Sequence, residues 1–361
     1  MKFQKLKLCL SLLAAALLAS CGSPGVPVPP SLELPRPVTD LHAVRKGDKV
    51  YLAWSASTET TDHHNIKHPG PIEVCRNTGS AMRQCGTAVT KIEFPKPPAG
   101  KREPKVQMSY TDQLPPKLKS EYPTSNIFYS VNVLNSYGRS AGLSNQVPVP
   151  AAPTLAPPSD FQAQLGPEGV HLTWKPFQPP QEILGLRYVV RVYRRERGRN
   201  ADAVAGEVPV SNESSPDLLD RSFEWEKTYN YRATVVTFVP EPGGGEQQVE
   251  GEDTAPVSVV AHDVFPPAIP SGLQAVFSGP GQKPFIDLVW TPNPEADLAG
   301  YNIYRRDRNG QAVKLNSELV KAPAFRDSEV LSGHQYFYSV SAVDVRGNES
   351  GRSPETAETV P

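Results

Sequence analysis

The sequence repeats one pattern three times, and this repetition constrains the fold more than any single residue does. Each copy opens with a proline and an apolar-x-Ala triplet, and continues with an alternating strand that ends in tryptophan. The openings are Pro37 with Leu41-His42-Ala43, Pro158 with Phe161-Gln162-Ala163, and Pro270 with Leu273-Gln274-Ala275; the strands end at Trp54, Trp174 and Trp290. Such repetition predicts a chain built from three similar units.

The three copies also agree farther along the chain. Each has a short strand that ends in aspartate, at Asp112, Asp220 and Asp327, and this recurrence indicates turn chemistry rather than acid-base catalysis. Each then has an alternating run, with one face formed by Ile127, Tyr129, Val131 and Val133, by Tyr229, Tyr231, Ala233 and Val235, or by Tyr336, Tyr338, Val340 and Ala342. Because strand side chains alternate between faces, these residues point into a core. No long amphipathic helix follows, so we predict an all-β protein.

The order of these segments resembles the fibronectin type III family, and the third copy matches it best. The matching segments are residues 288–292, 297–306 and 336–344. The resemblance implies seven-stranded Greek-key sandwiches of roughly 100 residues, related to the immunoglobulin fold, with the repeated tryptophan in the core. It also implies a corner tyrosine on the sixth strand, which Tyr229 and Tyr336 fit. The first copy has Ile127 at that position.

Proline clusters between the repeats and divides the chain. Two clusters, at residues 147–158 and 265–270, indicate linkers, because proline fixes φ and favours extended spacers. We therefore expect five segments: a lipoprotein signal peptide over 1–20, a Pro/Gly/Ser-rich tether over 21–35, and fibronectin type III-like domains over 36–150, 154–263 and 266–361.

The N-terminus has the pattern of an export signal. Three lysines within the first seven residues precede an apolar run at residues 8–18, which is too short to span a bilayer. The following Leu18-Ala19-Ser20-Cys21 resembles a bacterial lipobox, which implies cleavage before Cys21 and lipidation of that cysteine. An ordinary secretory signal is the alternative. We expect an exported protein anchored to a membrane of the cell envelope, the outer one if the host has two, since Gly22 is compatible with that sorting.

Only two cysteines remain once Cys9 leaves with the signal and Cys21 carries lipid. In an exported protein, Cys75 and Cys85 are expected to form a disulfide, and two separate reduced thiols are the alternative.

The charges of the chain exclude one class of partner. The 37 basic and 38 acidic residues nearly cancel, so we expect no nucleic-acid partner. A local feature is the run from Arg191 to Arg195. If Val190 and Val192 face inward, Arg191, Tyr193 and Arg195 share the outward face and could bind an anion or an acidic glycan. The alternative is a solvated sheet face that charge protects from edge pairing.

Two features of the first copy are further candidates for binding. His63, His64 and His68 could hold a metal, but they lack a Cys partner or an HExxH helix and more often form a hydrophilic turn, so we expect no metal. The basic, proline-rich insertion at residues 93–108 is either a contact surface or an unselected insertion.

No catalytic motif is recognisable in the sequence. It lacks a GxSxG elbow, a P-loop and a dinucleotide fingerprint, so we predict a protein that is not an enzyme and needs no cofactor. Two functions are compatible with this prediction. The first is a membrane-anchored lipoprotein of the envelope that binds a protein or glycan, adheres or acts as a spacer. The alternative is an accessory carbohydrate-binding module of a polysaccharide-degrading system, because modules of the resembled family often lie beside bacterial glycoside hydrolases.

Overall fold

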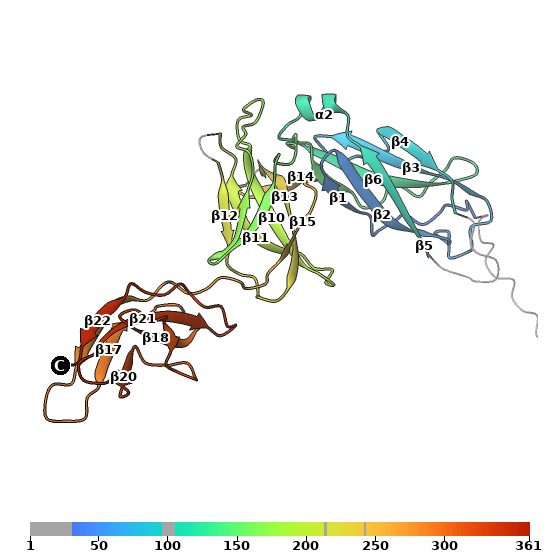
Figure 1. Cartoon of the computed structure of the whole chain (residues 1–361). Helices are drawn as coiled ribbons and strands as arrows, with labels where there is room; N and C mark the ends of the chain where they lie inside the picture. The colour runs from blue at the N-terminus through green and yellow to red at the C-terminus, as the bar shows by residue number, and fades with distance from the viewer. Residues whose placement is uncertain (1–30, 96–104, 213–214, 242) are drawn as a thin grey trace, which may run out of the picture. The chain divides into compact units, whose positions relative to one another are not determined.

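The computed structural model describes residues 31–95, 105–212, 215–241 and 243–361. The protein is nearly all β, with 50% of its residues in strands and 2% in helix, which confirms the predicted fold class. The described residues contain one short helix, α2 (Pro116–Glu121) (Figure 1). Within the described residues, no helix is long and apolar enough to cross a membrane. The signal peptide, Cys21 and most of the tether lie outside the described residues.

The first repeat has seven strands in two sheets. One sheet contains β1 (His42–Lys46), β2 (Lys49–Ser57) and β5 (Lys105–Gln113), with β2 in the middle. The other contains, in spatial order, β4 (Thr87–Ile92), β3 (Pro69–Thr78), β6 (Asn126–Asn135) and β7 (Val147–Pro150). The chain changes sheets between β2 and β3, as a Greek-key sandwich requires.

The second repeat follows the same plan with a divided last strand. Its smaller sheet has the order β12 (Asp217–Asp220), β9 (Gly169–Thr173), β8 (Gln162–Gly166). Its larger sheet contains β11 (Ala203–Pro209), β10 (Arg187–Glu196) and β13 (Thr228–Pro240). Both β14 (Glu246–Asp253) and β15 (Val257–Val260) pair with β13.

The third repeat also has seven strands. Its smaller sheet has the order β16 (Ser271–Phe277), β17 (Ile286–Thr291), β20 (Ala324–Asp327). Its larger sheet has the order β19 (Val313–Lys314), β18 (Leu298–Asp307), β21 (Gln335–Asp344), β22 (Thr356–Thr359). This division into three and four strands is the arrangement that the family resemblance implies.

Each repeat has its own cluster of buried apolar side chains between its sheets. Trp54, Trp174 and Trp290 lie in the three clusters, each no more than 5% exposed. The alternating face predicted for the later strand is buried in all three copies. Contacts between residues group the chain into two compact units, Met1–Pro153 with Val239–Val249, and Thr154–Phe238 with Glu250–Pro361. Independent folding of three domains therefore stays a prediction.

The corner tyrosines are present where the resemblance places them. The backbone N–H of Glu224 donates to Tyr229 Oη (3.0 Å), and that of Leu331 donates to Tyr336 Oη (3.1 Å). In each case the acceptor lies five residues after the donor, so the bond closes the corner before the sixth strand. In the first repeat, Ile127 fills this position as a fully buried side chain.

Two segments expected to be loops are partly strands. The proline cluster from residue 147 does not begin a linker, because residues 147–150 form β7. Among the described strands, β7 pairs only with β6, and proline is tolerated on such an edge because the missing N–H would face away from the sheet. Likewise the basic insertion ends earlier than expected, since β5 begins at Lys105 and pairs with β2. Residues 96–104 of that insertion lie outside the described part.

Candidate functional sites

A buried aspartate, a tyrosine and an arginine meet once in every repeat. Oδ2 of the aspartate accepts from both partners, in the trios Arg76–Asp112–Tyr129 (2.6 and 2.5 Å), Arg194–Asp220–Tyr231 (2.8 and 2.9 Å) and Arg305–Asp327–Tyr338 (2.7 and 2.9 Å). A turn role accounts for only part of the hydrogen bonds of these aspartates. Oδ1 of Asp220 does cap a turn by accepting from the N–H of Ser222 (2.8 Å), but Oδ2 binds side chains from two other strands.

The protonation of these trios suits a structural role. Burial and the adjacent Asp327 carboxylate raise the pKa of Tyr338, and the same causes raise the pKa of Tyr231 beside Asp220. Burial alone would raise the pKa of Asp220, but hydrogen bonds from Ser222, the charge of Arg194 and the Tyr231 hydroxyl together lower it. At neutral pH the tyrosine therefore stays a donor and the aspartate an acceptor, which holds the bond in place.

The outward face of β10 carries Arg191, Tyr193 and Arg195, as predicted, because Val190 and Val192 are buried. The three side chains contact carboxylates of the same repeat: Arg191 Nε lies 2.6 Å from Glu207, Tyr193 donates to Glu250, and Arg195 forms two bonds with Asp202 (2.7 and 2.8 Å). Since these cations already face anions, the geometry favours the solvated sheet face over an anion-binding surface. Glu207 lies on the adjacent β11, Asp202 just before β11 and Glu250 on β14, and the sequence alone does not reveal that these segments lie close to β10.

The structure separates the three clustered histidines. His63 contacts Arg36 Nη2 through its ring (2.7 Å) and has a left-handed φ of +65°, which marks a turn. The Nδ1 of His64 is 3.4 Å from Asp62, and His68 lines a separate hollow. Within the described ranges, these histidines do not come together in a set of three possible metal ligands, and one other group does.

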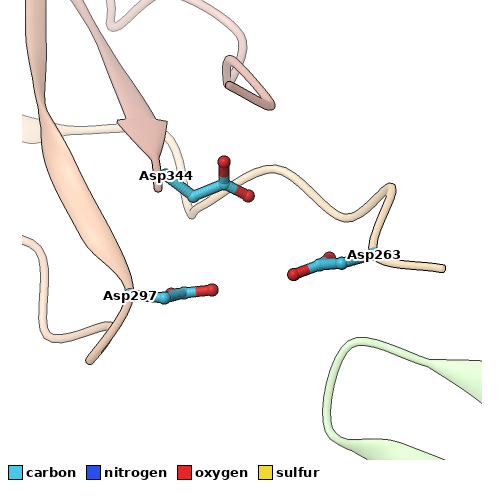
Figure 2. Close-up of side chains that lie close together, drawn as sticks. All are labelled: Asp263, Asp297 and Asp344. Atoms are coloured by element: carbon cyan, nitrogen blue, oxygen red, sulfur yellow. The ribbon is translucent and has the colours of Figure 1, made fainter. Parts of the chain in front are cut away.

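That group consists of Asp263 after β15, Asp297 before β18, and Asp344 at the end of β21 (Figure 2). Their carboxylate oxygens lie within 4.8 Å of one another. Oxygen ligands of this kind suit a hard cation. However, Arg346 Nη1 is 3.2 Å from Asp263, and Asp344 accepts from the backbone N–H of Arg346 and of Asn348 (both 2.8 Å). Asp263 therefore takes part in an ion pair, and Asp344 caps a turn. Sequence reasoning missed it, because its members lie up to 81 residues apart.

A hollow of about 620 Å³ lies at one end of the first repeat. It is lined by Ser31, Leu32, Glu33, His68, Tyr137 and Arg139. Tyr137 is 73% exposed, more than any other tyrosine among the large apolar side chains at the surface. Sequence reasoning did not select it, because a single tyrosine in a turn gives no periodic signal.

The two remaining cysteines are joined as predicted. Cys75 in β3 is bonded to Cys85, which precedes β4, and their Cα atoms are 5.3 Å apart. The bridge thus ties β3 to the segment that leads into its neighbouring strand β4. Whether it forms in the exported protein stays a prediction.

Comparison with known proteins finds relatives among polysaccharide-degrading enzymes. No family model matches the chain. Amylopullulanase from Thermoanaerobacterium saccharolyticum is 37% identical over 100 residues, which cover 28% of this chain and 7% of the enzyme. The amylopullulanase of Thermoanaerobacter thermohydrosulfuricus is 24% identical over 369 residues, covering 89% of this chain and 22% of the enzyme. This chain thus spans less than a quarter of the length of the relatives it matches.

Solved structures with similar strands are fibronectin type III proteins. The FN1–FN3 domains of chicken CNTN1 are 14% identical and cover 91% of this chain and all of theirs, with a TM-score of 0.25. An Fn3-like protein from Clostridium thermocellum is 30% identical and covers 27% of this chain and 96% of its own, with a TM-score of 0.23. The fold assignment itself rests on the strand order and cores described above.

Proposed function

We propose that the protein is a non-catalytic accessory module of a polysaccharide-degrading system and that it binds α-glucan. The observation that carries this proposal is the match to an amylopullulanase across 89% of the chain but only 22% of the enzyme. A chain that corresponds to a minor part of a large glucan-degrading enzyme is better suited to support that chemistry than to perform it. The amylopullulanase name denotes action on amylose-type glucans and pullulan, and this gives the ligand class.

The environment of the acidic residues supports a non-catalytic role. Hydrolysis of a glycosidic bond needs two carboxyl groups that face a cleft and act as acid and as nucleophile or base. In each repeat the buried aspartate at the strand end is instead held by an arginine and a tyrosine. A carboxylate held in this way has no access to a sugar oxygen. The proposal is therefore a binding function, with loops at the ends of rigid sandwiches as the contact surface.

Affinity electrophoresis of the mature chain tests this proposal. Native gels containing amylopectin or pullulan should slow the protein, whereas gels containing hydroxyethylcellulose, a β-glucan, should not. Incubation of the protein with pullulan should release no reducing ends above a buffer control. Equal migration in all gels would contradict glucan binding, and release of reducing ends would contradict the non-catalytic assignment.

We also propose that Cys21 anchors this module to a membrane of the cell envelope. The support is the succession of lysines, apolar run and Leu18-Ala19-Ser20-Cys21 in the sequence. An acyl chain stabilises membrane attachment by about 0.8 kcal/mol per buried CH₂, so two or more chains suffice for a stable anchor. Such an anchor would keep bound glucan close to the cell, which combines the two functions considered from the sequence.

A further inference from the structure

The turn that carries Tyr137 does not itself require a tyrosine. Asn135 Oδ1 accepts the backbone N–H of Tyr137 (3.0 Å) and of Arg139 (2.9 Å). In the third repeat, Asp344 Oδ1 accepts the N–H groups two and four residues later in the same way, and the position that matches Tyr137 is Arg346. The same turn thus forms around a charged residue. The geometry of the turn therefore does not account for the tyrosine at this position, where its side chain is 73% exposed.

The hollow beside Tyr137 is held by a rigid frame. Asn135 is 1% exposed, and besides its two turn bonds its Nδ2 donates to Leu32 O (3.1 Å). The N–H of Ser136 donates to His68 O (3.0 Å), which fixes the segment before β3. Three segments that are distant in sequence are therefore connected around one buried amide. Such a frame holds the lining side chains in place before a ligand arrives.

One acceptor in the polar wall of the hollow is without a hydrogen-bond donor. Glu33 Oε2 is buried and has no hydrogen-bond partner in the described part of the chain. A buried carboxylate oxygen without a donor costs free energy, so Glu33 gains a bond if a ligand hydroxyl comes within reach of it. His68 and Arg139 line the same hollow and contribute N–H donors. The wall can therefore both accept from and donate to one ligand.

We propose that this hollow is a subsite for a neutral glucan chain, with Tyr137 as the stacking platform. A sugar ring offers apolar C–H groups to an aromatic face and hydroxyl groups at its rim, which match the tyrosine and the polar wall. The volume of about 620 Å³ lies within the range of small-ligand sites. The lining contains one carboxylate, one guanidinium and one imidazole, so it gives no strong preference for an anion. This inference rests on the proposed function and assigns its site.

Substitution of Tyr137 in the full mature chain tests the site. In amylopectin gels, Tyr137→Ala should weaken binding at least tenfold, because the stacking surface is lost. Tyr137→Phe keeps the ring and should bind within about twofold of the native chain. The matched control is Tyr51→Ala, which removes a 45% exposed tyrosine from β2 of the same repeat and should leave binding unchanged. Circular dichroism melts of all variants check that each is folded.

The possible outcomes separate the site from the function. If the native chain binds amylopectin and folded Tyr137→Ala binds equally well, the site is wrong while the proposed function stands. Equal losses in Tyr137→Ala and Tyr51→Ala would also overturn the site. Binding to heparin in preference to amylopectin would overturn the assignment to a neutral ligand. If the native chain binds none of these glycans, the proposed function fails together with the site.

Discussion

In the third repeat the hydroxyl of Tyr338 donates to Asp327 Oδ2 across 2.9 Å, and both residues are at least 96% buried. Arg305 reaches the same oxygen at 2.7 Å. These side chains come from β21, β20 and β18, so one carboxylate connects the two sheets of the sandwich. Because the same trio recurs in every repeat, we interpret it as a component of the fold.

Removal of this carboxylate should destabilise the third repeat strongly. Asp327→Ala leaves the Tyr338 hydroxyl without its acceptor and the Arg305 guanidinium without its carboxylate partner, with only Glu329 O as acceptor, which should cost about 3 kcal/mol, whereas Tyr338→Phe should cost only about 1 kcal/mol. Hydrogen exchange of peptides from β17 and β21 reports this repeat within the full chain. The control Tyr304→Phe removes an exposed bond to Glu349 and should cost little. Equal effects of all three substitutions would argue against the carboxylate as the connecting group.

The second repeat should lose stability in acid through Asp220. The folded pKa of Asp220 lies below its ordinary value of 3.8, so the unfolded chain binds a proton more readily. The stabilisation is therefore fully present above about pH 4 and is lost as the pH falls through the folded pKa. Urea unfolding between pH 7 and pH 2.5 should show this loss. Hydrogen exchange of peptides from β9 and β13 reports the unfolding of this repeat.

The matched variant for this pH dependence is Asp220→Asn. It should be less stable than the native chain at pH 7, and the difference should shrink as the pH falls below 4, since the amide does not titrate. A constant difference over the whole range would show that Asp220 does not carry the acid sensitivity.

Membrane attachment should depend on one sulfur atom. Cys21→Ala removes the expected site of lipidation, so the protein should move from the membrane fraction to the soluble fraction and lose labelling by a radioactive fatty acid. Cys75→Ala is the control, because that cysteine lies in the folded part and should not affect fractionation. Unchanged membrane association of Cys21→Ala would contradict the anchor.

The architecture was predictable from the sequence because the residues that define it recur at regular positions in each repeat. Trp54 and its counterparts, the alternating strands and the corner tyrosines Tyr229 and Tyr336 all carry local signals, and all are found where they were expected. Strand pairing carries no such signal. The edge position of β7, which permits its prolines, and the acids that face Arg191 both depend on which strands lie side by side.

The candidate sites were less predictable for the same reason. The recurrence of Asp327 at a strand end indicates only a turn role, since its partners Arg305 and Tyr338 lie on other strands and only the folded sandwich brings them within 3 Å. The hollow at Tyr137 likewise needs the segment at Glu33 and the segment at His68, which are 35 residues apart in sequence. Sites assembled from loop ends require the three-dimensional arrangement.

The disulfide between Cys75 and Cys85 should stabilise the first repeat and no other. It closes a loop of ten residues, for which chain entropy predicts somewhat less than ~3 kcal/mol. The first repeat has Ile127 in place of a corner tyrosine, so it lacks the corner hydrogen bond of the other two repeats. Reduction of the native chain should therefore speed hydrogen exchange in peptides of β3 and β6, while peptides of β18 and β21, from a repeat without cysteine, should not change. A Cys75→Ala, Cys85→Ala double variant should match the reduced chain.

Peptide mapping without reductant gives the direct test: recovery of both cysteines as free thiols from protein matured in its own envelope would exclude the bridge.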